Sequence, residues 1–125
     1  MHGFRTRFHL YTVPGQILYE RTRLAVLNGA DGIVFVADSQ SEKFEENLQS
    51  ISELEMNMRR LGKDMSRYPI VMQWNKRDMP SALPVNVLER YLNRRRMPSF
   101  EAVASSGKGV FATLRAISKN VMAQL

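Results

Sequence analysis

The tetrad Asn75-Lys76-Arg77-Asp78 places an amide, two cations and a carboxylate directly after an apolar run. A guanine ring offers two adjacent donors, N1–H and the exocyclic amine, which one carboxylate can accept together. Asp78 suits that role, because adenine would leave its carboxylate unpaired and would be rejected strongly. Asn75 can tie the loop to its neighbours and reach N7, while the Lys76 stem lies against the base. A turn in which Asp78 caps the next helix is the alternative.

A second loop, "VASSGKGV" at residues 103–110, invites comparison with a phosphate-binding loop. Such a loop needs a glycine five positions before Gly107 and a serine or threonine after Lys108, and the sequence has neither. A flexible loop before the last helix is the simpler interpretation of Lys108.

Strand and helix patterns alternate along the chain and would position these loops. Apolar runs predict strands at residues 4–13, 32–38, 68–75 and 99–104. Helical periodicity predicts helices at residues 16–27, 41–62, 85–93 and from residue 110 onward. This alternation predicts an α/β fold with a mostly parallel, doubly wound sheet and right-handed crossovers.

Polar residues follow each predicted strand. In a parallel α/β sheet, ligands bind at the carboxyl ends of the strands. The polar sets at those ends are residues 12–16, 38–40, 75–78 and 104–106. We therefore expect all four sets to lie together along the carboxyl end of the sheet, which we call the rim. Asp38 is expected to cap the turn that follows it.

The composition limits the classes of protein to which the chain can belong. A length of 125 residues suits one domain, and no apolar run nears the about 20 residues that span a bilayer. Cysteine is absent, and the two histidines lack further ligands at metal spacing, so no disulfide, thiolate or metal site is predicted. A cytoplasmic protein is expected. Despite the net charge of +6, the basic cluster at residues 90–98 is interpreted as a solvated helix end, and nucleic-acid binding is the weakest alternative.

Two of the loops resemble parts of the nucleotide site of Ras-like GTPases. "TVPGQ" at residues 12–16 is similar to the D-x-x-G-Q switch, with Thr12 where the family usually has an Mg²⁺-linked aspartate. The resemblance implies that the Gly15 amide contacts the γ-phosphate and that Gln16 orients the attacking water. "VASS" is similar to the S-A-K loop, which implies that the Ala104 N–H reads guanine O6 and that Ser105 flanks the base.

The resemblance can be narrowed from Ras-like GTPases in general to one group of them. The residues that narrow it are Thr12 and the segments "LNGADGIVFVADSQ" and "QWNKRD". Along nearly its whole length the chain is similar to the MglA-type GTPases of bacterial cell polarity and gliding motility. The resemblance implies a Ras-like P-loop NTPase fold, a molecular switch that binds GTP or GDP with Mg²⁺, and regulation by a Roadblock-domain activator such as MglB. Effector proteins are also implied.

The chain contains no phosphate cradle of the form G-x-x-x-x-G-K-[ST]. In the resembled family, that loop and most Mg²⁺ ligands precede the strand that begins here at Phe4. Residues 1–125 are therefore expected to be the C-terminal portion of one small GTPase domain, from switch II through the last helix. A partial Ras-like fold without its N-terminal strands would leave an exposed sheet edge, so the chain alone is expected to fold poorly and to bind GTP weakly or not at all.

Two functions remain open from the sequence. In the first, guanine is read by Asn75, Asp78 and Ala104, and Gln16 assists hydrolysis. In the second, the chain hydrolyses no GTP and binds a partner through the switch-helix surface at residues 17–27.

Overall fold

Runs rich in β-branched and aromatic residues form the strands of one parallel sheet. The computed structural model describes residues 9–12 and 27–124. Its strands are β1 (His9–Thr12), β2 (Ile33–Asp38), β3 (Ile70–Asn75) and β4 (Ser99–Glu101), in the order β1-β2-β3-β4. Every pair of neighbours is parallel. β2 and β3 are buried almost throughout, as expected for strands covered on both faces.

The helices begin and end where local sequence signals place them. They are η1 (Ser41–Lys43), α2 (Phe44–Arg60), α3 (Val85–Leu92), η2 (Ala104–Ser106) and α4 (Val110–Gln124). Gly62 follows α2 with a φ of 71°, and its N–H donates to the Arg59 carbonyl at 3.0 Å. The Lys63 N–H donates to the Met58 carbonyl at 2.9 Å, which completes a Schellman motif. Pro84 precedes α3 at the N-cap position.

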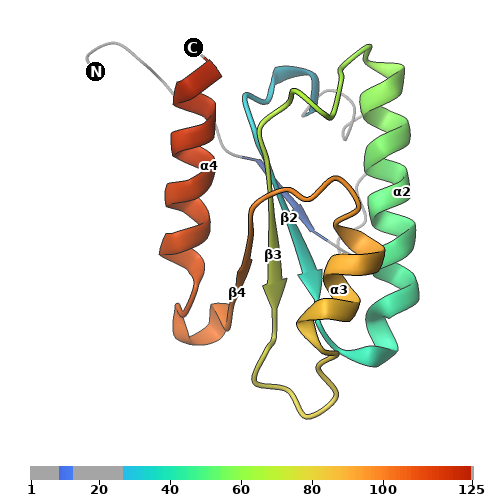
Figure 1. Ribbon diagram of the computed structural model, residues 1–125, viewed down its shortest axis with the longest axis vertical. Helices are drawn as coiled ribbons and strands as arrows, with labels where there is room; N and C mark the ends of the chain where they lie inside the picture. Colours follow the sequence, from blue (N-terminus) through green and yellow to red (C-terminus); the bar gives the residue numbers. More distant parts are fainter. Residues whose placement is uncertain (1–8, 13–26, 125) are drawn as a thin grey trace.

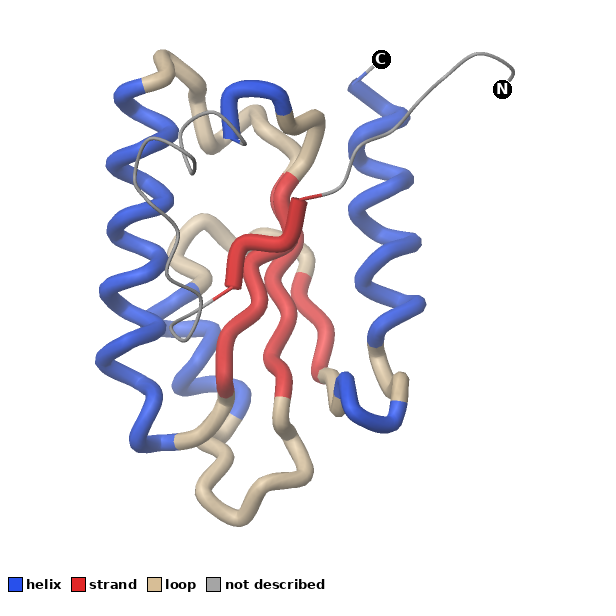
Figure 2. The backbone as a smooth tube through the Cα atoms, turned by 180° about the vertical axis from the view of Figure 1, so that it is seen from behind, coloured by secondary structure: helices blue, strands red, loops and turns tan. Residues whose placement is uncertain are grey.

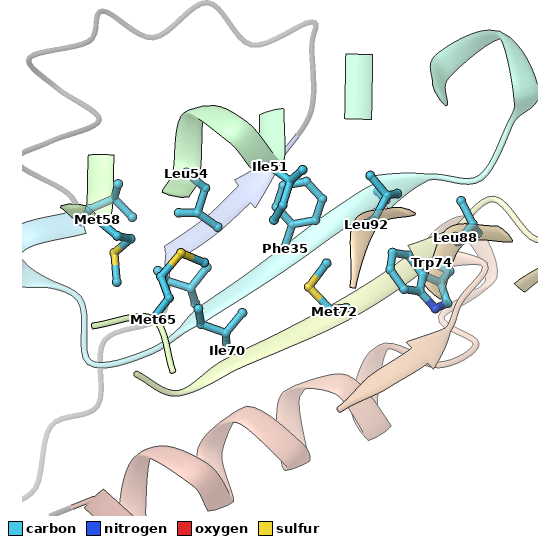
Figure 3. Close-up of a cluster of buried hydrophobic side chains, with 13 residues drawn as sticks. Phe35, Ile51, Leu54, Met58, Met65, Ile70, Met72, Trp74, Leu88 and Leu92 are labelled. Carbon is cyan, nitrogen blue, oxygen red and sulfur yellow. The ribbon is translucent and has the colours of Figure 1, made fainter. Parts of the chain in front are cut away.

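The helices cover both faces of the sheet. Figure 1 shows α2 and α3 on one side of the strands and α4 on the other, and Figure 2 shows α2 and α4 flanking the sheet from behind. The larger core lies under α2 and α3, where Figure 3 shows Ile51 beside Phe35 and Leu88 beside Trp74. Within the described part of the chain, the smaller core under α4 contains the buried residues Val34, Val71, Ile117 and Val121. The predicted doubly wound α/β sheet is therefore confirmed.

A carboxylate on α3 ties that helix to two strands. Glu89 accepts hydrogen bonds from the Trp74 indole N–H at 2.9 Å and from the Ser99 hydroxyl at 2.5 Å. The side-chain amide of Asn93 donates to the other carboxylate oxygen of Glu89 at 2.7 Å. Because Trp74 immediately precedes Asn75, this network fixes the end of β3 from which the candidate base-reading loop departs.

The predicted elements are confirmed in type within the described residues, with shifted bounds. The strand predicted at residues 99–104 ends at Glu101, because the Val103 N–H bonds to the Lys108 carbonyl at 2.9 Å and turns the chain into η2. Residues 27–29 are helical, but the rest of the helix predicted at 16–27 lies outside the described residues. No helix within residues 27–124 is both long and apolar enough to cross a membrane.

Candidate functional site

The loops after β2, β3 and β4 meet at the carboxyl end of the sheet, the lower end in Figure 1. The Ser39 N–H donates to the Asn75 carbonyl at 3.0 Å, which joins the first loop to the second. The Arg77 N–H donates to the Ala102 carbonyl at 3.2 Å, which joins the second loop to the third. Three of the four predicted polar sets therefore share one rim.

Asn75 connects the second loop to the third through its side chain. Its Oδ1 accepts a hydrogen bond from the Ala104 N–H at 2.9 Å. Its Nδ2 donates no hydrogen bond to the described part of the chain. The amide is therefore oriented by the protein, and its donor remains available to a ligand at the rim.

Asp78 lies exposed in the turn after β3. The Met79 N–H donates to the Lys76 carbonyl at 3.1 Å and closes this turn. Within residues 27–124, no hydrogen bond or ion pair engages the Asp78 carboxylate. The alternative in which Asp78 caps the next helix is wrong, because Pro84 occupies the N-cap of α3 and no side chain caps that end.

Lys76 adopts a left-handed backbone conformation, with a φ of 61°, which is unusual for a residue with a side chain. Its Nζ pairs with Oδ2 of Asp38 at 3.0 Å. The Gln40 N–H also donates to Oδ1 of Asp38 at 3.1 Å, so the predicted capping of this turn by Asp38 is confirmed. The ammonium is thus held at the end of β2, with half of the Lys76 side chain still exposed.

Ala104 and Ser105 are exposed in η2, beside Asn75. The N–H of Ala104, which the family resemblance assigns to guanine O6, is engaged by Asn75 in this structure. The neighbouring N–H of Ser105 makes no hydrogen bond within the described residues. Two adjacent backbone donors are therefore present, and only the second is unengaged.

The glycines around Lys108 shape a tight turn. Gly109 has a φ of 81°, and a Cβ on it would lie 2.1 Å from the Glu101 carbonyl oxygen. Val103 and Lys108 form an antiparallel bridge across the turn. Gly109 therefore has a structural reason to be present in this turn.

The comparison with known proteins gives one strong relationship. No protein-family model matches the chain. Over all of its 125 residues, the chain is 49% identical to the mutual gliding-motility protein MglA of Myxococcus xanthus. The chain is therefore a homologue of this MglA. It spans 64% of the length of that relative, and its parallel sheet with helices on both faces agrees with part of a Ras-like P-loop fold.

The residues predicted to act on phosphate fall largely outside the described part of this MglA homologue. Thr12 ends β1, and its Cα pairs with Val36, two residues before the rim residue Asp38. Gly15 and Gln16 lie outside the described residues. Across residues 9–12 and 27–124, no three acidic or histidine side chains gather closely enough to hold a metal ion.

Sequence reasoning missed two residues that shape the rim of this MglA homologue. Asp38 was expected only to cap a turn, yet it also binds Lys76. Asn47, on α2, bonds both backbone groups of Asp38 and is fully buried. An asparagine on the helix face that also carries Ile51, Leu54 and Met58 is the signal that could have indicated Asn47, whereas the Asp38–Lys76 pair depends on strand register.

Proposed function

We propose that the protein binds guanine nucleotides and acts as a small GTPase of the MglA type, a molecular switch in bacterial cell polarity or gliding motility. The observation that carries this proposal is the rim itself. An exposed carboxylate on Asp78 and an oriented amide on Asn75 lie on a loop that is bonded to both of its neighbours. The relationship to a gliding-motility protein supports the biological setting.

The rim matches guanine in its donors and acceptors. Asp78 would accept from N1–H and from the exocyclic amine, and Nδ2 of Asn75 would donate to N7. Guanine O6 needs a backbone donor from η2. The Ser105 N–H is unengaged within the described residues, whereas the Ala104 N–H would have to share or release its bond to Asn75. The apolar stem of Lys76 would lie against the ring.

Hydrolysis would depend on the residues near the end of β1. In this proposal the Gly15 amide contacts the γ-phosphate, Gln16 orients the attacking water, and Thr12 stands beside them. Mg²⁺, when bound, would supply neutralisation of the phosphate charge. We further propose a cytoplasmic location, where GTP is available, and regulation by a Roadblock-domain activator like MglB together with effectors.

The base site can be tested apart from the phosphate site by titrating nucleosides into the ¹⁵N-labelled protein. We expect guanosine to shift the amide signals of residues 75–78 and 104–106, and adenosine to shift none of them. Asp78→Asn should lower guanosine affinity by about tenfold or more, because a charge-assisted pair of hydrogen bonds is lost. The same variant should gain affinity for xanthosine, whose carbonyl at C2 accepts from the new amide.

Asp64→Asn is the matched control, because Asp64 lies in the loop after α2, at the other end of the sheet, and bonds only locally to Ser66 and Arg67. It should leave guanosine affinity unchanged. Equal binding of guanosine and adenosine, or no effect of Asp78→Asn on base preference, would contradict the proposal.

The second candidate is a partner-binding protein without hydrolysis, acting through residues 17–27. Of these, only Leu27 is described, and it is buried in the core under α2. A chain that binds guanosine but releases no phosphate from GTP, with or without a Roadblock-domain protein, would favour this candidate.

A further inference from the structure

Asp38 belongs to the strand beside the base-reading loop, yet its carboxylate contacts that loop. The sheet register places Asp38 opposite Asn75, one residue before Lys76. The Asp38 side chain is only 11% exposed, and its Oδ2 lies 3.0 Å from the Lys76 Nζ. Gln40 donates to both carboxylate oxygens, with its backbone N–H and its side-chain amide. All of these bonds fix the carboxylate in one orientation.

The backbone of Asp38 is fixed independently by Asn47 of α2. The Asp38 N–H donates to Oδ1 of Asn47 at 3.2 Å, and Nδ2 of Asn47 donates to the Asp38 carbonyl at 2.7 Å. Asn47 is fully buried, so water does not compete for these bonds. The position of the carboxylate is therefore set by the fold, and no ligand is needed to create it.

A second carboxylate, that of Asp78, follows Lys76 closely in the chain. Asp78 is two residues further along, in the turn that the Met79 N–H closes on the Lys76 carbonyl. A long, flexible lysine side chain could pair with either carboxylate. In the structure it pairs with Asp38, and Asp78 remains unpaired within the described residues.

We propose that Asp38 is a positioning residue of the guanine site, which holds the Lys76 ammonium away from Asp78. Asp78 then keeps both oxygens for the two donors of the base, and the Lys76 stem is drawn across the loop as a flat apolar surface. Without Asp38, the ammonium would pair with Asp78 and compete with guanine. This inference rests on the proposed function: in it, Asp38 maintains the specificity of the proposed site for guanine.

The test compares guanosine with inosine, which lacks the exocyclic amine. Asp38→Asn keeps the shape and one acceptor of the side chain but loses the ion pair. It should lower guanosine affinity by about tenfold and bring the guanosine and inosine affinities closer together, because Asp78 becomes occupied. Asp64→Asn, at the other end of the sheet, should change neither affinity.

A rescue variant separates this role from a general effect on folding. Asp38→Asn/Lys76→Met removes the released ammonium and keeps an unbranched apolar stem, so it should restore the preference for guanosine over inosine. Lys76→Met alone should lower both affinities equally. A double variant no better than Asp38→Asn would show that Asp38 acts through the fold and would overturn the inference.

A measurement without ligand completes the design. The Lys76 ammonium should give a slowly exchanging ¹⁵N signal in the wild-type protein, and that signal should be lost in Asp38→Asn. If the wild-type protein binds guanosine and Asp38→Asn keeps both the signal and the base preference, this inference fails while the proposed function stands. If the wild-type protein binds no guanosine, the proposed function fails, and the assignment of Asp38 to a guanine site fails with it.

Discussion

Asp38 and Asp78 both lie where a strand ends, but the fold gives them different surroundings. Asp38 is nearly buried and receives bonds from Gln40 and Lys76. Asp78 is exposed, with no partner in the described part of the chain. The first carboxylate is therefore committed to structure, and the second is available to a ligand.

The surroundings of Asp38 also set its pKa. Burial raises the pKa, but the hydrogen bonds from the Gln40 N–H, Lys76 and the Gln40 amide, with the charge of Lys76, outweigh burial and lower it below its ordinary value of 3.8. A lowered pKa means that the charged form is favoured in the folded protein. Its contribution to stability is thus complete above about pH 3.8 and is lost as the pH falls through the lower, folded-state value.

We expect this pH dependence to distinguish wild type from Asp38→Asn. Urea unfolding at about pH 6 should show the wild-type protein to be more stable, because only it has the ion pair and the charged acceptor. The difference should shrink as the pH is lowered below about 3.8. In a Lys76→Met background the difference at pH 6 should already be smaller. A difference that stays constant across this range would exclude a contribution from Asp38 ionisation.

At the scale of the elements, the turn between η2 and α4 is tightly constrained. It has to carry the chain from the rim into α4 while Gly109 passes the backbone of β4. Gly109 is therefore required on two grounds, its positive φ and its close approach to the Glu101 carbonyl. Because η2 presents the Ala104 and Ser105 amides, the geometry of this turn also positions part of the candidate site.

A series of glycine-to-alanine variants should separate these two grounds. Gly29→Ala meets open space at ordinary φ and should change the free energy of unfolding little. Gly62→Ala also meets open space, but at a φ of 71°, and should cost about 1 kcal/mol. Gly109→Ala adds a clash with backbone to a similar φ and should cost clearly more than Gly62→Ala. Urea denaturation measures all three, and equal costs at residues 62 and 109 would contradict the role of close approach.

For the molecule as a whole, the two faces of the sheet differ in how much core they bury. Among the described residues, thirteen buried residues form the core under α2 and α3, against four under α4. Several apolar side chains of α4 remain exposed, and Phe111 is 79% exposed. The helix on the smaller core has fewer apolar partners to lose when it detaches.

We therefore expect α4 to open at a lower free energy than α2. Native-state hydrogen exchange should show amides of residues 114–121 exchanging through an opening that costs less than the opening of residues 48–58. Ile117→Ala should lower the cost of the α4 opening by about 2–5 kcal/mol, while Leu54→Ala should lower the cost of the α2 opening by a similar amount. A single opening free energy for both helices would show that the faces unfold as one unit.

The sequence by itself determined the kinds of element and the residue types at the rim. A continuous apolar run predicts β2, and Gly62 predicts the end of α2. Both can be predicted from the sequence because each signal depends only on residues within one segment. The carboxylate of Asp78 and the amide of Asn75 indicate guanine in the same way, because both belong to one short segment and their hydrogen-bonding groups follow from residue type alone. The 49% identity to MglA agrees with the family that the motifs resemble.

Only the tertiary structure decided which rim residues act on one another. The register of β2 against β3 places Asp38 opposite Asn75, and a shift of one residue would turn its side chain to the other face. Asn47 reaches Asp38 from a different element, α2. The Glu101 carbonyl of β4 leaves no room for a side chain at residue 109, and this contact explains the glycine there. These contacts join segments that are distant in the chain, so no local pattern of residues encodes them.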